Sequence, residues 1–267
     1  MSSILALRQR EAAHLATDAA NYLQPSGILT SVNAAKCIAL PTLHAAVSST
    51  GPAGLGAFIG HALTLRCDSF DDVIRRGEEL LPAIVEEYRE YRDDLCATLY
   101  VIGWSQDQRR PGAFSMDVWS DGSARAAQVL ENSANKRPER FKFTEQVLAG
   151  TPIPGPDLLA AAGFRVPDDL DVMDPANDLL HLLEIQRHEQ IEDRFWVGGK
   201  AVLTTVDGDG IGQRVIHHWR EDQVGELISP LPIDWSRWRR RETAVVDARS
   251  PLNRKQRRAQ RHQGRVA

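Results

Sequence analysis

Three residues in the first part of the chain have the types and spacing of a nucleophilic catalyst. Ser2 follows Met1, and a small residue at this position usually permits removal of the initiator methionine. Ser2 would then carry both a hydroxyl and a free α-amine, whose ordinary pKa is about 7.7–8.0. A group that titrates near neutral pH suits general base catalysis, so Ser2 would be a nucleophile with its own base. Asp18 and Lys36 supply two charges that can support it.

Two predicted β-hairpins must position these residues. Residues 3–17 contain two apolar runs of strand-like length separated by a polar turn, and residues 36–48 contain a second such pair. Asp18 therefore closes the first hairpin, and Lys36 lies at the start of the second. Residues 22–27 between them are a predicted loop because of their Pro and Gly.

The rest of the chain alternates helices with further strands. Ser69 and Asp174 are the expected N-caps of two helices, because acidic residues or a proline fill the first turn after each. The predicted helices are 53–66, 69–94 and one from 174 onward, and the later strands are 97–104, 113–119, 195–206 and 212–219. Neighbouring strands join through tight turns, which excludes a run of βαβ units. The order predicts an α+β protein with two mainly antiparallel sheets covered by helices on their outer faces.

Composition restricts the class of protein. The chain has 267 residues, of which 42% are hydrophobic and 25% charged, which is ordinary for a globular protein with a substantial core. The net charge of −4 does not suggest a polyanion binder. No apolar run approaches the roughly 20 residues of a membrane helix, and no secretory signal is expected. Cys37, Cys67 and Cys96 are widely spaced, which indicates buried thiols in a reducing cytoplasm and neither a disulfide framework nor a zinc site. We therefore expect a cytoplasmic protein without membrane contact, cofactor or metal.

A change in composition divides the chain into a domain and an extension. Residues 1–230 hold the periodic segments, with an expected insertion near residues 124–160. Residues 231–267 are basic, rich in Trp and Arg, and lose periodicity, so we expect the tail to be disordered or a lone basic helix.

The order and residue types of the N-terminal half resemble the proteasome-type branch of the N-terminal-nucleophile hydrolases, which includes bacterial proteasome-related homologues. Members of this branch begin with a nucleophile, follow it with an apolar strand, end the second strand in an aspartate and open the third with a lysine. The segments that carry the resemblance are Ser2-Ser3-Ile4-Leu5-Ala6, Ala16-Thr17-Asp18-Ala19, Asn33-Ala34-Ala35-Lys36 with Ile38, and His44-Ala45-Ala46-Val47-Ser48-Ser49-Thr50-Gly51.

The resemblance implies a four-layer αββα sandwich and amide-bond hydrolysis by a peptidase or amidase. In this family pattern a buried Lys36 lowers the pKa of the Ser2 hydroxyl, and Asp18 keeps Lys36 in place and charged. The amide of Ser49 or Thr50 meets the developing oxyanion, and loss of such a donor typically costs about 3–4 kcal/mol of transition-state stabilisation. The resemblance also implies a homo-oligomer such as a ring, with the predicted helix up to residue 94 as a contact.

Two departures from the family pattern support a non-catalytic alternative. Ala19 and Ala20 stand where the family has an arginine after the aspartate motif, and Ser49 and Thr50 precede Gly51 where the family commonly has a glycine. The alternative is an inactive proteasome-like scaffold or assembly protein. Each site residue also has an ordinary interpretation, namely a strand-end cap for Asp18, an edge-strand charge for Lys36 and a helix N-terminus for the Ser49 turn.

The C-terminal extension suggests a third hypothesis. Trp235 and Trp238 are interleaved with the basic run Arg237–Arg241, and an arginine-rich tail follows. This pattern is typical of an RNA-binding segment or of one that binds an acidic partner. The simpler interpretation is a solvated tail whose tryptophans dock on the domain.

Two further groups of polar residues have a structural interpretation. His181, Glu184, His188 and Glu189 lie on one predicted helix without a metal-binding motif, so we interpret them as surface polar residues. The segment 207–212 resembles a calcium or phosphate loop in its Asp and Gly content, but it lacks the closing residues of either and predicts a hairpin turn.

Overall fold

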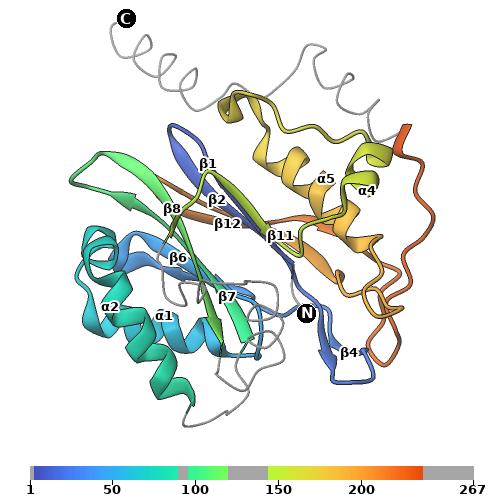
Figure 1. The fold of residues 1–267 in the computed structure, drawn as a ribbon, viewed down its shortest axis with the longest axis horizontal. Helices are drawn as coiled ribbons and strands as arrows, with labels where there is room; N and C mark the ends of the chain where they lie inside the picture. Colours follow the sequence, from blue (N-terminus) through green and yellow to red (C-terminus); the bar gives the residue numbers. More distant parts are fainter. Residues whose placement is uncertain (1–2, 90–95, 120–143, 237–267) are drawn as a thin grey trace, which may run out of the picture.

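The computed structural model describes residues 3–89, 96–119 and 144–236 of the chain. It is an α+β protein with antiparallel sheets and four α-helices in this described part (Figure 1). Ser2, residues 124–143 of the expected insertion and the basic tail from residue 237 lie outside it. None of the helices that the structure describes has the length and apolar content needed to cross a membrane.

The first five-stranded sheet contains the N-terminal hairpin in the middle. Its strands lie in the order β10-β1-β2-β11-β12. Their bounds are β1 Ile4–Arg8, β2 Ala12–Asp18, β10 Leu148–Thr151, β11 Lys200–Asp207 and β12 Gly210–His218. The predicted hairpin is confirmed, with Ile4 opposite Thr17 in the register. Strand β1, which follows Ser2, therefore lies between its hairpin partner β2 and strand β10 from the middle of the chain.

The second five-stranded sheet contains the second predicted hairpin. Its order is β5-β6-β7-β8-β9, with bounds β5 Cys37–Leu40, β6 Ala45–Ser49, β7 Cys96–Ser105, β8 Arg110–Trp119 and β9 Thr144–Glu145. A short 3₁₀ helix, η1 Pro41–Leu43, connects β5 to β6. Residues 144–151, which the sequence places within an insertion, contribute the edge strand of each sheet.

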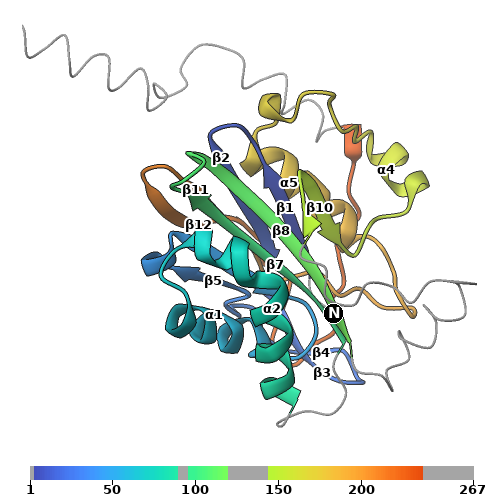
Figure 2. The same ribbon diagram turned by 60° about the vertical axis from the view of Figure 1, so that its left-hand side comes forward.

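A separate two-stranded hairpin includes the loop predicted over residues 22–27. Its strands are β3 Asn21–Leu23 and β4 Ile28–Ser31. The loop prediction is confirmed for residues 24–27, which form the turn, and was wrong for residues 22–23, which belong to β3. Leu29 of β4 is buried, and its N–H donates to Glu226 O at 2.8 Å. Figure 2 shows this hairpin as an arm that extends from the end of the two large sheets.

Each large sheet has its own helices. Helices α1 Leu55–Arg66 and α2 Phe70–Arg89 pack on the second sheet, where Ile59 and Ile84 meet Val101 in one apolar cluster. Helix α5 Pro175–Arg187 packs on the first sheet through Leu179 and Leu183. Helix α4 Pro156–Ala162 contacts α5 and adds Ala162 to the same apolar cluster. The 3₁₀ helix η2 Leu170–Val172 connects α4 to α5. The helix starts agree with prediction: Ser69 Oγ accepts from Asp72 N at 3.1 Å, and Asp174 Oδ1 accepts from Ala176 N at 2.9 Å.

A third apolar cluster contains residues from both large sheets. Ile4 and Leu15 of the first sheet lie in it together with Tyr100 and Ile102 of the second. Strand β1 is buried on both faces, because Leu5 and Leu7 belong to the helix-facing cluster while Ile4 and Ala6 belong to this one. A strand covered on both sides needs a continuous apolar run, which explains the sequence Ile4-Leu5-Ala6-Leu7.

Candidate active site

The two predicted charged residues meet as a buried ion pair. Asp18 ends β2 and Lys36 directly precedes β5, and Lys36 Nζ lies 2.6 Å from Asp18 Oδ1. The Lys36 side chain is 6% exposed and the Asp18 side chain 0%. Lys36 is therefore a buried partner of Asp18, and its interpretation as a solvated edge-strand charge was wrong.

Asp18 also binds three backbone amides. Its Oδ1 atom accepts from Ser3 N at 2.9 Å, and its Oδ2 atom accepts from Ala20 N at 3.2 Å and Gly198 N at 3.3 Å. A buried carboxylate is costly unless it is paired and hydrogen-bonded. Lys36 supplies the opposite charge, and the three amides supply further hydrogen bonds to both carboxylate oxygens. Asp18 thus connects the start of β1, the segment before β5 and the segment before β11.

The backbone amide of Ser3 lies close to this pair. Asp18 Oδ1 accepts from both Ser3 N and Lys36 Nζ, so these two nitrogens cannot lie further apart than the sum of 2.9 and 2.6 Å. The Ser3 hydroxyl donates to Gln186 Oε1 on α5. Ser2 itself lies outside the described residues, but it is covalently joined to an amide that the Asp18 carboxylate holds.

The environment of Lys36 perturbs its titration. Burial lowers the pKa of the Lys36 ammonium below its usual 10.5, and the charge and hydrogen bond of Asp18 oppose that shift. The Lys36 ammonium thus depends on Asp18 to offset the cost of its burial.

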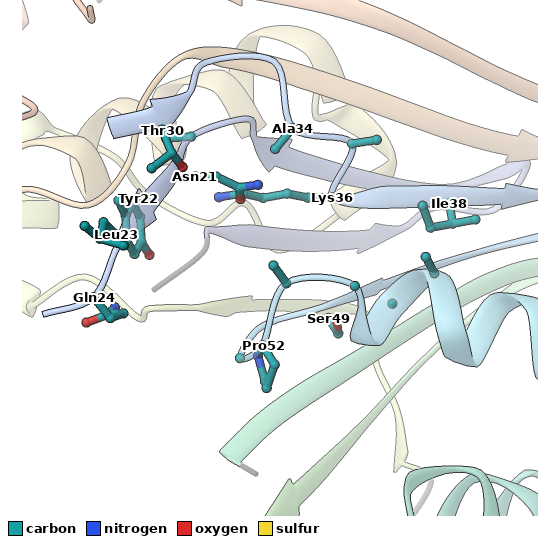
Figure 3. Close-up of a pocket in the computed structure, with 17 residues that line it drawn as sticks. Asn21, Tyr22, Leu23, Gln24, Thr30, Ala34, Lys36, Ile38, Ser49 and Pro52 are labelled. Carbon is teal, nitrogen blue, oxygen red and sulfur yellow. The ribbon is translucent and has the colours of Figure 1, made fainter. Parts of the chain in front are cut away.

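A cleft of about 530 Å³ opens beside Lys36. Its walls come from the β3–β4 hairpin, the segment before β5 and the start of α1. Figure 3 shows Lys36 on one side of the cleft, with Ser49 and Pro52 on the other. Among the described residues that line it, Lys36 is the one that carries a charge, and the others are small, apolar or uncharged polar residues: Ala20, Asn21, Tyr22, Leu23, Gln24, Thr30, Ala34, Ala35, Ile38, Ser49, Gly51, Pro52, Ala53, Gly54, Gly56 and Ala57. The cleft suits an uncharged chain segment.

The two predicted oxyanion donors differ in their surroundings. Ser49 ends β6 and lines the cleft. Thr50 N, in contrast, donates to Thr98 O at 3.0 Å, and the Thr50 hydroxyl accepts from Thr98 N at 2.7 Å. The Thr50 amide is thus engaged by the second sheet, because the β6–β7 ladder continues for one residue beyond Ser49. Of these two amides, that of Ser49 is the remaining candidate.

Helix α5 contributes polar side chains to the core. His181 is 2% exposed and Glu184 5%, so their interpretation as surface residues was wrong. Glu184 Oε1 accepts from Trp219 Nε1 at 2.7 Å, and the ring of His181 packs against Trp235 at 5.7 Å between centroids. This contact confirms docking for Trp235, while Trp238 and the arginines lie outside the described residues.

The predicted turn at residues 207–212 is confirmed as the β11–β12 hairpin. Asp207 Oδ1 accepts from Asp209 N at 2.9 Å and from Gly210 N at 3.1 Å. The carboxylate therefore stabilises the turn through its backbone amides.

Sequence reasoning missed the residues that surround Asp18 from the C-terminal half. Gly198 supplies an amide to Asp18, and Arg187 and Asp222 form a buried pair next to it. The consecutive glycines Gly198 and Gly199 were a usable signal, because such pairs often mark a close approach of backbone. No local sequence pattern predicts that Arg187 is buried and paired, since a basic residue in the last turn of a helix is ordinary.

Comparison with models of known protein families found no match to this chain, and comparison with curated protein sequences found no significant one.

Proposed function

We propose that this protein is a proteasome-like N-terminal-nucleophile hydrolase that cleaves amide bonds with Ser2. The observation that carries the proposal is the shared oxygen of Asp18, which accepts from Lys36 Nζ and from the amide of Ser3. Through this oxygen, the backbone amide of Ser3, whose nitrogen is bonded to the Ser2 carbonyl carbon, lies near a buried ammonium. The proposal includes a four-layer αββα sandwich, which is supported by helices on each sheet and by an apolar cluster shared between the sheets.

In the proposed reaction, removal of Met1 frees the α-amine of Ser2. This amine accepts the proton of the Ser2 hydroxyl as Oγ attacks the carbonyl carbon of the substrate, and Lys36 stabilises the negative charge that develops on Oγ. The Ser49 amide would stabilise the oxyanion. When the tetrahedral intermediate collapses, the scissile C–N bond breaks and the leaving amine of the substrate takes the proton from the Ser2 α-amine. The acyl group remains as an ester on Ser2 Oγ. Water then hydrolyses this ester to the carboxylic acid and regenerates free Ser2. The cleft beside Lys36 would hold the peptide or amide substrate.

Mass spectrometry and one substitution test this proposal. The intact mass should correspond to loss of Met1 with an unmodified Ser2, because a retained Met1 or an acetylated Ser2 leaves no free amine on the serine. Hydrolysis of fluorogenic peptides with uncharged side chains should fall by at least about 10³-fold in Ser2→Ala. An epoxyketone, which can bond to both the hydroxyl and the amine of an N-terminal residue, should label Ser2 alone. The control Ser26→Ala changes an exposed turn serine and should keep wild-type hydrolysis.

A non-catalytic scaffold is the second candidate. It is favoured by the engagement of the Thr50 amide with Thr98 and by Ala19 and Ala20 after the aspartate. In that case Ser2→Ala would leave the oligomeric state and every assayable function unchanged. We propose a homo-oligomer for either candidate, with ring assembly through α2 as in the family that the chain resembles. Light scattering of the purified protein measures the assembly directly.

A further inference from the structure

The segment before β11 forms two hydrogen bonds with the residues at the end of β2. Gly198 N donates to Asp18 Oδ2 at 3.3 Å, and Gly198 O accepts from Ala19 N at 3.1 Å. Lys36 occupies the other carboxylate oxygen. The Gly198 peptide is therefore one of the groups that fix the rotation of the Asp18 carboxylate.

A buried pair of charged side chains holds the peptide groups next to Gly198. Arg187 Nη1 donates to Val197 O at 2.6 Å, and Asp222 Oδ2 accepts from Gly199 N at 2.6 Å. Arg187 and Asp222 also bind each other through two bonds, Nη1 to Oδ2 at 2.9 Å and Nη2 to Oδ1 at 2.7 Å. Their side chains are 1% and 0% exposed. Such a two-bond fork fixes geometry as well as charge.

The two glycines permit this close approach. A Cβ atom at Gly198 would overlap Asp222 Oδ2. Gly199 has a φ of +77°, and a Cβ there would lie 2.7 Å from Val32 O. Only residues without a side chain let Asp222 reach the backbone at this point.

A buried ion pair gives little stability compared with apolar residues of similar volume, because both charges lose their hydration. The contacts of this pair with Val197 O and Gly199 N point to a role in positioning the backbone. We infer that Arg187 and Asp222 are positioning residues of the site, which together fix the Asp18–Lys36 pair. Arg187 holds the peptide group whose N–H donates to Asp18. Asp222 holds the next peptide group, whose carbonyl accepts from Ala19 N. The catalytic consequence rests on the function proposed above.

Loss of this support has a measurable effect on Lys36. Asp18 opposes the lowering of the Lys36 pKa by burial. If the Gly198 amide no longer holds Asp18, the carboxylate can rotate away from Lys36, and the pKa of Lys36 falls further. A merely structural role of Asp222 would leave this pKa unchanged in a folded variant.

The test uses the full chain with the double substitution Arg187→Met and Asp222→Leu. This change removes both charges at once, and such replacements often leave the protein folded. Nuclear magnetic resonance would measure amide exchange at Gly198 and Ala19 and the titration of the Lys36 side chain. We expect exchange at Gly198 to accelerate by at least about ten-fold, as local opening becomes easier. The Lys36 pKa should fall, and the pH profile of kcat should shift with it.

The control is Arg66→Met with Glu87→Leu, which removes a different arginine–carboxylate pair with two bonds, between α1 and α2. It should change neither Gly198 exchange nor the Lys36 pKa. A milder variant, Arg187→Lys, keeps the positive charge but cannot bind Val197 O and both Asp222 oxygens together. It should show smaller changes in the same direction, and it provides the test if the double variant does not fold.

The outcomes separate this inference from the proposed function. Faster Gly198 exchange and a lower Lys36 pKa in a protein that hydrolyses nothing would support the positioning role and reject the hydrolase. Wild-type exchange, Lys36 pKa and pH profile in the folded variants would overturn the positioning role, whatever the activity.

Discussion

Substitution of Lys36 by Met should destabilise the protein by an amount that the structure allows us to estimate. The change removes the ammonium and keeps a side chain of similar length, so the Asp18 carboxylate stays buried without its ion partner. Removal of one partner of a buried ion pair typically costs about 3–5 kcal/mol. Asp18 keeps three backbone donors, from Ser3, Ala20 and Gly198, which places the cost at the lower limit, about 3 kcal/mol.

Urea unfolding at pH 7 measures this free energy. We expect the midpoint to fall without a change in the slope, and the thermal midpoint to fall by about 6–12 °C for a chain of this size. The matched control is Asp18→Asn combined with Lys36→Met, which leaves no buried charge but keeps an oxygen for the backbone donors. It should recover most of the loss. A loss below about 1 kcal/mol in Lys36→Met alone would refute the reasoning, because an unpaired buried carboxylate cannot be that inexpensive.

Three other predictions concern the rest of the chain. Burial lowers the pKa of His14 to about 4. Because His14 in the unfolded chain protonates near pH 6.5, its contribution to the free energy of unfolding is complete above pH 6.5 and is lost toward pH 4, by about 3 kcal/mol in total. His14→Gln should weaken this pH dependence in urea titrations at several pH values. Gly103→Ala places a Cβ in the ring of Phe70 and should cost about 1–3 kcal/mol, whereas Gly212→Ala meets no atom within 4 Å and should change the thermal midpoint little. Burial raises the pKa of Cys37 to about 12, so peptide mapping should find iodoacetamide on this thiol only after denaturation.

The sequence carries enough information for the elements with strong local signals. Ser69 and Asp174 cap helices because their side chains satisfy free backbone amides, and this chemistry depends only on the next few residues. The N-terminal hairpin is readable because its apolar runs have strand length. The pairing of Asp18 with Lys36 was expected only from the resemblance to a known family, because no local pattern joins two residues 18 positions apart that adjoin strands of different sheets.

Features that depend on residues far away in the sequence could not be predicted from local sequence patterns. Strand β4 pairs with the nearby β3, but the backbone of its buried Leu29 also bonds to residues 225–226, far along the chain. Strand β10 owes its conformation to pairing with β1, because Leu148–Thr151 has no alternating pattern of its own. The engagement of the Thr50 amide depends on Thr98. In each case the partner lies more than 40 residues away, beyond any periodicity in the segment itself.

The pairing of β2 with β11 has a consequence for the order of folding. Residues 12–18 pair with residues 201–207, so the first sheet has a high contact order and cannot close until most of the chain has been synthesised. Strands β5 to β8 of the second sheet, in contrast, need no residue beyond 119. The Gly198 amide reaches Asp18 only with β11, which makes the buried pair one of the last parts of the molecule to mature. A nascent chain would therefore lack the Gly198 support of Asp18 until this segment has been synthesised.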